Sequence, residues 1–478
     1  MTDARLRNTA LLVAGCFFME NLDGTIVATA APRIGHALHV ASTSVGLVIA
    51  AYMVTLAVLI PLSGWMAARW GARSVFMSAI TVFTLASLAC AASTTFAELV
   101  AFRVLQGVGG AMMVPVGRLV VLSRTPKSQM LRTVGLLVWP ALLAPVIAPL
   151  AGGIITTYAN WRWLFLVNVP LGALALVVAW RLIDSPPTAD APPLDPVGVV
   201  LTCGGLASAT YMAYLLSLRT VPWFGVIVCA VAAVIALAGA TVHLLRAAHP
   251  LVNLRTLRVP TFRAAVGSGS LFWTAIQSVP FLLTLLFQTA FGWSPVKSGA
   301  VVMFVFVGNV GIKPATTPML RRFGYRPVLV TATAGAAATM VGAALFTAAT
   351  PLVLIAVVAV LNGIGRSVSL TCYSTIAFAD TPPEQIRDAN TLQATAQQLA
   401  VGLGVPLGAV ALRAGGALGG ALPGAVTAET PFAVAFVLLA IVALGGTVGA
   451  LRLHRDAGSA VTRRARPEPA AATAAGDP

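Results

Sequence analysis

Long apolar segments alternate along the chain with short polar ones. Segments such as 45–62 and 328–345 contain no charged residue. A helix needs roughly 20 apolar residues to cross the hydrocarbon core of a bilayer, and strict alternation, which would indicate a membrane β-barrel, is absent from these segments. The pattern predicts fourteen helical spans, at approximately 9–31, 43–66, 74–94, 97–122, 131–155, 162–183, 197–217, 222–245, 263–289, 297–320, 328–349, 351–377, 389–414 and 431–452.

Composition excludes a soluble globular protein. Of the 478 residues, 58% are hydrophobic and only 9% are charged, and the mean hydropathy is +0.91. These are values of a polytopic helical membrane protein, and the predicted spans leave only short loops. The net charge of +16 is spread over short basic clusters between apolar segments. No nucleic-acid partner is therefore expected, because such clusters indicate membrane topology.

The positions of lysine and arginine predict the orientation. With the N-terminus inside, most of them fall in cytoplasmic loops, and an even number of spans places both termini in the cytoplasm. The basic residues that fall on the outer side are Arg33, Arg162, Arg219, Lys297 and Arg413.

Two loops after predicted spans repeat one another. The segment 69–73, with sequence RWGAR, is echoed by 322–326, with sequence RFGYR, and Thr125-Pro126 is echoed by Thr381-Pro382. This repetition predicts two six-helix bundles with an additional pair of helices between them. The expected domains are 1–183, an N-terminal six-helix bundle; 184–262, a linker and an inserted two-helix hairpin; 263–452, a C-terminal six-helix bundle; and 453–478, a disordered cytoplasmic tail.

Two acidic residues lie deep within the first predicted span. Glu20 and Asp23 are three residues apart, which places them on one helical face. Because a charge is expensive inside a membrane, each is a candidate functional group, and either could carry a transported proton. Alternatively, Asp23 is a permanently ionised partner of Arg103 and joins the first and fourth spans. We expect Glu20, Asp23 and Arg103 to form the proton-coupling site.

Two cations in the second half have no acidic partner at a similar depth. Lys313 and Arg366 lie inside predicted spans. They could contact substrate, reach the acids of the first span or, for Lys313, extend toward the interface. Uncompensated positive charge in a cavity would favour an anionic substrate. Polar side chains expected to complete the cavity, or else to join helices, are Asn21, Gln277, Asn309, Asn362, Gln393 and Gln397.

Three segments resemble a known family. FMENLDGTIV at 18–27, RVLQGVGG at 103–110 and WRWLFLVNVP at 161–170 resemble motifs of the fourteen-span drug:proton antiporters of the major facilitator superfamily. The segment 113–118 and the loop 323–326 are most similar to the MdtD-like branch. The resemblance implies the major facilitator fold, an all-α membrane architecture, and links the motif arginine, Arg103, to proton transfer.

The same resemblance implies residues that control the change of conformation. They lie in or just before the repeated loops and in the proline- and glycine-rich fifth span: Gly64, Arg69, Gly71, Arg73, Pro145, Pro149, Gly152, Gly153, Arg322, Gly324 and Arg326. Two departures from the family pattern stand out. Ala68 replaces the usual acid of the loop motif, and Ala144-Pro145 and Ala148-Pro149 replace Gly-Pro pairs.

Enzymatic chemistry has no support in the sequence. There is no Gly-rich phosphate-binding loop ending in Gly-Lys-Ser/Thr, and the five histidines and five cysteines have no metal-ligand spacing. We expect no cofactor, no metal site and no ATP-driven transport.

These observations predict a proton-coupled exporter of small organic compounds in a bacterial inner membrane, working by alternating access. Its expected partners are a small-molecule substrate, protons and the lipid bilayer. Whether a periplasmic adaptor takes part stays open, and a monomer is expected. Two alternatives remain at this point: an exporter of an organic anion that uses Lys313 and Arg366, and an uncoupled facilitator.

Overall fold

The computed structural model describes residues 3–40, 45–126, 129–184, 193–218, 220–419, 427–454 and 457–458, and these ranges contain helices and no β-strand. The all-α expectation is therefore confirmed for this part of the chain. Most of the predicted tail at 453–478, residues 185–192 of the linker, and the basic residues Lys127 and Arg219 lie outside the described residues.

The first half of the chain forms one bundle. α6 packs against α1, α3 and α5, and α1 packs against α7 and α9. The helices are α1 (Asp3–Ile26), α2 (Ala31–Ala37), α3 (Gly46–Leu59), α4 (Ser63–Trp70), α5 (Ala72–Ala92), α6 (Phe96–Leu122), α7 (Met130–Tyr158), α8 (Trp163–Leu166) and α9 (Asn168–Leu182), with 3₁₀ turns at Val27–Ala30 and Ile60–Leu62.

The second half repeats this arrangement. α17 packs against α14, α16 and α12, and α12 packs against α18 and α19. The elements are the 3₁₀ turn Leu254–Arg258, α12 (Pro260–Gln277), α13 (Val279–Leu285), the π-helical turn Leu286–Ala290, α14 (Pro295–Gly311), α15 (Lys313–Phe323), α16 (Tyr325–Ala344), α17 (Leu352–Ala379), the 3₁₀ turn Pro383–Gln385, α18 (Ile386–Gly419) and α19 (Thr430–Leu451).

Helices α10 (Pro196–Ser217) and α11 (Trp223–Arg246) form the hairpin predicted between the halves, and α10 contacts both α3 and α18. Asp195 joins the start of α10 to α11 and the segment that follows it. The Asp195 carboxylate accepts hydrogen bonds from the Gly198 and Leu251 amides and contacts Nε2 of His243 at 2.7 Å. Burial raises the pKa of Asp195, but these hydrogen bonds outweigh it and hold the pKa below its usual range. As a division into domains, the predicted boundaries stay a prediction.

Glycine allows the central helices of both halves to approach their neighbours closely. Gly107 and Gly109 of α6 meet α3 and α5, and Gly363 and Gly365 of α17 meet α14 and α16. A Cβ at any of these positions would lie under 3.0 Å from a neighbouring atom. The segments VLQGVGG at 104–110 and VLNGIGR at 360–366 therefore occupy equivalent places, a repeat that our sequence analysis did not identify.

The number of spans is supported in part. Eleven helices among the described residues are long and apolar enough to cross a membrane, and the pair Lys297–Gly311 and Lys313–Phe323, bent by 48°, adds a twelfth if it is one span. α1 and α7, at 24 and 29 residues, are not in that set. The polar residues Glu20, Asn21 and Asp23 lower the hydropathy of α1. Fourteen spans stay a prediction.

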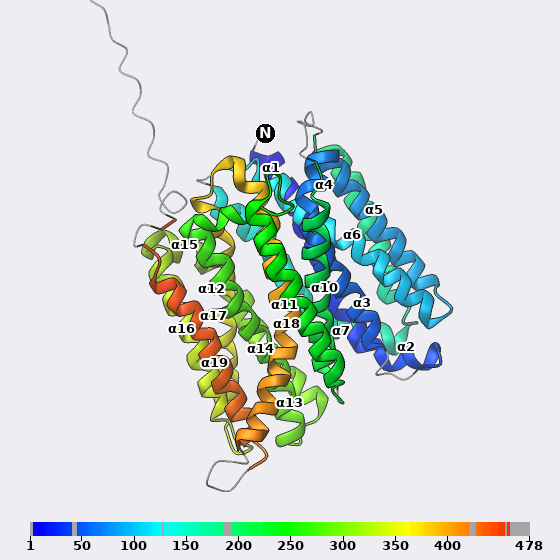
Figure 1. The fold of residues 1–478 in the computed structure, drawn as a ribbon. Helices are drawn as coiled ribbons and strands as arrows, with labels where there is room; N and C mark the ends of the chain where they lie inside the picture. The colour runs from blue at the N-terminus through cyan, green and yellow to red at the C-terminus, as the bar shows by residue number, and fades with distance from the viewer. Residues whose placement is uncertain are drawn as a thin grey trace, which may run out of the picture.

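The two ends of the molecule differ in charge. The N-terminus, α4 and α15 lie at one end, and α2 and α13 lie at the other (Figure 1). We call the first the basic end, after Arg69, Arg73, Arg322 and Arg326 in and beside α4 and α15. It is the end that the sequence predicts to be cytoplasmic.

The halves meet at the basic end. Gly64 of α4 faces Thr391 of α18, where an added Cβ would lie 2.5 Å from the threonine hydroxyl. Asn390 Nδ2 donates a hydrogen bond of 2.8 Å to the carbonyl of Pro115. Ala394 of α18 packs within the apolar core of the first bundle. At the opposite end, a core cluster of the first bundle contains, among the described residues, no residue of the second.

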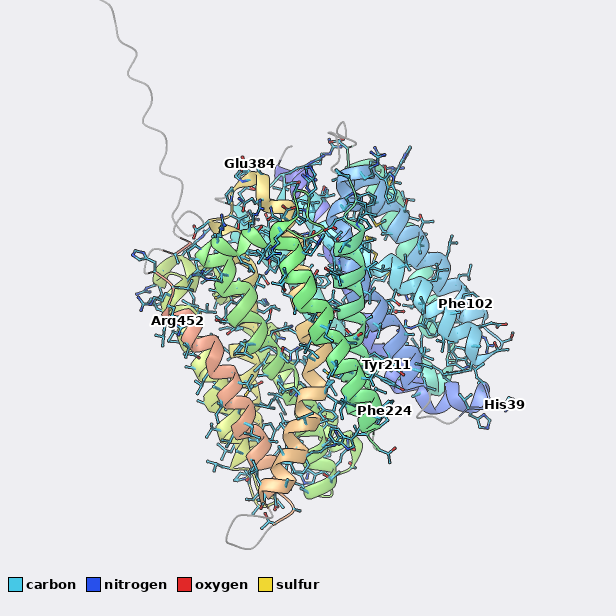
Figure 2. The ribbon with its side chains drawn as sticks, in the orientation of Figure 1. His39, Phe102, Tyr211, Phe224, Glu384 and Arg452 are labelled. Atoms are coloured by element: carbon cyan, nitrogen blue, oxygen red, sulfur yellow. The ribbon has the colours of Figure 1, made fainter. Side chains whose placement is uncertain are left out.

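The predicted orientation can be tested by cysteine labelling. Glu384 projects near the basic end, and His39 and Phe224 lie toward the other (Figure 2); all three are exposed. We expect a membrane-impermeant maleimide to label His39→Cys and Phe224→Cys in cells with a permeabilised outer membrane, and Glu384→Cys only after the inner membrane is opened. The unmodified chain supplies the background from its own cysteines. Labelling of Glu384→Cys in sealed cells would reverse the orientation.

Candidate functional site: a central cavity with one acid and two arginines

A cavity of about 180 Å³ lies between the two halves. The first half contributes side chains from α1, α3, α6 and α7, and the second from α12, α17 and α18. Its polar lining residues are Glu20, Asn21, Thr25, Tyr52, Arg118, Gln277, Arg366, Gln397 and Gln398. Of the residues predicted to form the proton-coupling site and cavity, Glu20, Asn21, Gln277, Arg366 and Gln397 are brought together here.

Glu20 is the acid of this cavity. Its residue exposure is 9%, and Oε2 has no hydrogen-bond partner among the described residues. No ion pair within 4.0 Å involves Glu20 among the described residues. The side chain of neighbouring Asn21 is satisfied locally, because Nδ2 donates to the carbonyl of Phe17 at 2.9 Å. Glu20 is thus a carboxyl group with unused hydrogen-bonding capacity facing the cavity.

Two buried guanidinium groups face the same cavity. Arg118 of α6 and Arg366 of α17 are 4% and 6% exposed, and neither forms an ion pair among the described residues. Arg118 Nη1 reaches Gln397 Oε1 at 3.5 Å, whereas Arg366 Nε has no partner among those residues. The Arg366 guanidinium lies 5.1 Å from the ring centre of Trp273, so an aromatic face partly replaces a counter-ion.

Asp23 lies outside the cavity, in a sealed ion pair. Arg103 Nη1 and Asp23 Oδ2 are 2.5 Å apart, and both side chains are completely buried. Arg103 Nε also donates to the carbonyl of Val48 at 3.3 Å, and its guanidinium lies 4.3 Å from the ring centre of Tyr52. The alternative in which Asp23 is the structural partner of Arg103 therefore matches the observed geometry.

Three neutral side chains complete this pair. Gln106 Nε2 donates to Asp23 Oδ1 at 3.0 Å and to Ser87 Oγ at 2.7 Å, and its Oε1 accepts from Arg103 at 2.8 Å. Asn168 Nδ2 donates to Asp23 Oδ1 at 2.8 Å. The network thus connects α1, α5, α6 and α9. These hydrogen bonds and the ion pair replace the water that would otherwise solvate the buried carboxylate.

The remaining predicted polar residues lie elsewhere in the second half. Lys313, at the bend between α14 and α15, donates to Thr371 Oγ1 at 2.8 Å, and Asn362 Nδ2 donates to Thr339 Oγ1 at 2.9 Å. The Asn309 side chain is fully buried and has no partner among the described residues. Gln393 lines a smaller pocket beside the cavity. Lys313, Asn309, Asn362 and Gln393 are not among the residues that line the central cavity.

The residues predicted to control the change of conformation have different surroundings in the structure. Gly71 and Gly324 end α4 and α15 with φ of 81° and 79°, the left-handed region that favours glycine. Arg73 Nη2 donates to the carbonyl of Trp180 at 3.0 Å. Gly64 and Gly152 are buried, Arg326 is partly buried, and Arg69 and Arg322 are exposed. The side chains of Pro145 and Pro149, and the surroundings of Gly153, lie outside the described part of the structure.

Sequence reasoning missed several residues of the site. Arg118 was not among the residues predicted for the site, yet it is buried in the cavity wall. Its position four residues before the end of α6 suggested the membrane interface rather than the cavity. Gln106 and Asn168 lay inside the quoted family motifs without a role. No signal in the sequence pointed to Tyr52 or Trp273, because aromatic residues in spans are usually core.

Comparison with known proteins adds independent information. Residues 13–405 match the family model of the Major Facilitator Superfamily. The chain is 33% identical over 412 residues to a Pectobacterium carotovorum protein named "Putative multidrug resistance protein MdtD", covering 86% of this chain and 88% of that protein. A protein of the same name from Salmonella newport is 34% identical over 419 residues, covering 84% and 85%.

Solved structures share the fold at low identity. The human organic anion transporter MFSD10 (TETRAN) has a TM-score of 0.63 at 14% identity, covering 93% of this chain and all of that one. The proton:xylose symporter XylE also has a TM-score of 0.63 at 14% identity, covering 93% and 95%. The match to the family model, the identity to the MdtD proteins and this shared architecture agree. The chain belongs to the major facilitator superfamily.

Proposed function

We propose that this protein is a secondary transporter that exports small organic compounds in exchange for protons, with Glu20 as the proton-binding group. The observation that carries the proposal is a carboxyl group without a hydrogen-bond partner for Oε2 in a cavity between two repeated halves. The MdtD relatives are named for multidrug resistance, which supports drug-like substrates. The same proposal places the protein in a bacterial inner membrane and gives it protons, a small molecule and lipid as partners.

Alternating access is supported by where the halves meet. They contact one another at the basic end, through Gly64 and Thr391 and through Asn390 and Pro115. The cavity of about 180 Å³ is smaller than the roughly 300–1,000 Å³ of pockets that hold drug-sized molecules. Substrate binding therefore requires the halves to move apart around the cavity, which is the movement that a rocking cycle supplies.

Glu20 can couple proton transport to substrate transport because the proton and the substrate would bind in the same cavity. A protonated Glu20 donates a hydrogen bond, whereas an ionised one attracts a cationic or hydrogen-bond-donating substrate. Opening to either side changes the water around the carboxyl group and so its affinity for the proton. Asp23, held by Arg103, Gln106 and Asn168, instead supports the helices around it.

Neutralising Glu20 should remove coupling without unfolding the protein. We expect Glu20→Gln to lower proton-driven export to the background of vesicles lacking the protein, because glutamine cannot exchange a proton at this position. Substrate-dependent proton release from energised everted vesicles measures this. Glu98→Gln is the matched control, since Glu98 sits in the exposed capping box of α6, where glutamine is tolerated. Normal export by Glu20→Gln would refute the assignment.

Asp23→Asn should act through stability. The substitution leaves the buried Arg103 guanidinium without its ionic partner, and breaking a buried pair costs about 3–5 kcal/mol. We expect thermal unfolding in detergent at a clearly lower temperature than for the unmodified chain, with Glu20→Gln close to normal. Unchanged thermal stability of Asp23→Asn, together with lost coupling, would instead make Asp23 a proton carrier.

A second substrate class is favoured by one observation. Two buried guanidinium groups, Arg118 and Arg366, line a cavity that contains a single carboxylate among its described lining residues. Positive charge without a counter-ion suits an organic anion. This differs from the arrangement expected from sequence, because Arg118 takes the place of Lys313.

The two substrate classes can be separated by variants of the arginines. If anions are exported, Arg118→Gln and Arg366→Gln should each reduce export of an aromatic carboxylate by at least about tenfold, the cost of losing a charged hydrogen bond, and leave lipophilic cations unaffected. Arg246→Gln, at the exposed end of α11, is the control. Anion export that survives both cavity substitutions would remove this candidate.

A further inference from the structure

A groove outside the central cavity opens between α12 and α19 at the basic end. Its volume is about 690 Å³. Arg263 lies in the first turn of α12, and Arg452 follows the last residue of α19, so both lie where their helices end. Figure 2 shows Arg452 at the edge of the bundle. The groove is therefore at the depth of lipid headgroups rather than in the hydrocarbon core.

The groove has a charged mouth and an apolar wall. Arg263 and Arg452 are exposed, and their side chains form no ion pair within 4.0 Å with another described residue. Ala264, Gly267 and Leu271 extend from this mouth along α12. From residue 263 to 271 the helix rises about 12 Å. A Cβ added at Gly267 would have no neighbouring atom within 4 Å, so the wall is recessed at this position.

The first half carries a groove at the equivalent place, between α1 and α9, with a volume of about 600 Å³. Its wall is also apolar, but Arg181 is the only ionisable basic residue among its described lining residues. The repeat thus supplies two similar lipid-facing grooves that differ in charge. This difference allows one groove to serve as the internal control for the other.

We propose that the α12–α19 groove binds an anionic phospholipid, with the phosphate between Arg263 and Arg452 and one acyl chain along Ala264, Gly267 and Leu271. Two guanidinium groups match a phosphodiester in charge and hydrogen-bonding geometry, and basic pockets between spans on the cytoplasmic side suit anionic headgroups. The chain's own continuation is a poor occupant, because residues 459–466 carry three arginines and no acid.

Two other titratable residues line the groove. Asp380, after the end of α17, is exposed and adds one negative charge, and His454 adds a positive charge when protonated. The two arginines still leave the mouth net positive. Asp380 should therefore weaken the binding of an anionic headgroup without preventing it, and a zwitterionic headgroup with a terminal ammonium is the competing occupant.

Native mass spectrometry of the full-length protein can test the site. The chain is titrated with phosphatidylglycerol or phosphatidylcholine of identical acyl chains. We expect the double variant Arg263→Gln/Arg452→Gln to bind phosphatidylglycerol about tenfold or more weakly, because each basic residue contributes about 1 kcal/mol to the binding of anionic lipid. Both side chains are exposed, so these substitutions remove no core packing. Arg263→Lys/Arg452→Lys should retain most of the binding. Arg181→Gln should bind like the unmodified chain, and Asp380→Asn should bind more tightly.

Four results would overturn the proposal. Equal binding of phosphatidylglycerol by the double glutamine variant and the unmodified chain would show that the arginines do not hold the phosphate. Equal retention of phosphatidylcholine would make the groove a general acyl-chain surface. Binding of phosphatidylethanolamine that exceeds phosphatidylglycerol and is lost in Asp380→Asn would assign a zwitterionic lipid. Displacement by millimolar inorganic phosphate would indicate a free-anion site.

Discussion

The cost of burying charge inside a membrane organises the first bundle. Asp23 and Arg103 are fully buried, and each neutralises the charge of the other. Gln106 and Asn168 donate hydrogen bonds to Asp23, and the Val48 carbonyl accepts one from Arg103, whose Nη2 has no partner among the described residues. Ser87 fixes Gln106 in turn. The consequence reaches beyond stability: once Asp23 is committed to this network, Glu20 is the acid left for the cavity, one turn further toward the basic end.

The second bundle uses the same helix plan without the same ion pair. In the repeated segment, Ala359 stands where Arg103 stands in the first half, and Arg366 stands where Gly110 does. Gly110 packs against Tyr52 and Leu56, which line the cavity. An arginine at the equivalent place therefore has its side chain in the cavity wall. These two differences between the repeats remove a buried charge from the core of the second bundle and add one to the central cavity.

The sequence was informative where physical constraints act along one helix. Apolar segments predicted the helices, and the cost of isolated charges made the pairing of Asp23 with Arg103 one of the two alternatives for Asp23. The direction in which a side chain points around its helix axis was harder to predict from the sequence. Lys313 and Asn362 were predicted to face the cavity from their positions within spans. Which neighbour each side chain faces depends on the packing of other helices, and both turn toward threonines within the second bundle. Arg118 was missed for the same reason, since depth alone suggested the interface.

The charge of the cavity constrains the direction of coupling. A cationic substrate near Glu20 competes with the proton, because each is favoured by the same ionised carboxylate, and competition for one site is what exchange in opposite directions requires. An anion held by Arg118 and Arg366 is instead favoured by protonation of Glu20, which removes the nearby negative charge. The two ligands would then bind together and move in the same direction. Proton-driven export of an anion by this cavity therefore needs a second titrating group, whereas export of a cation needs only Glu20.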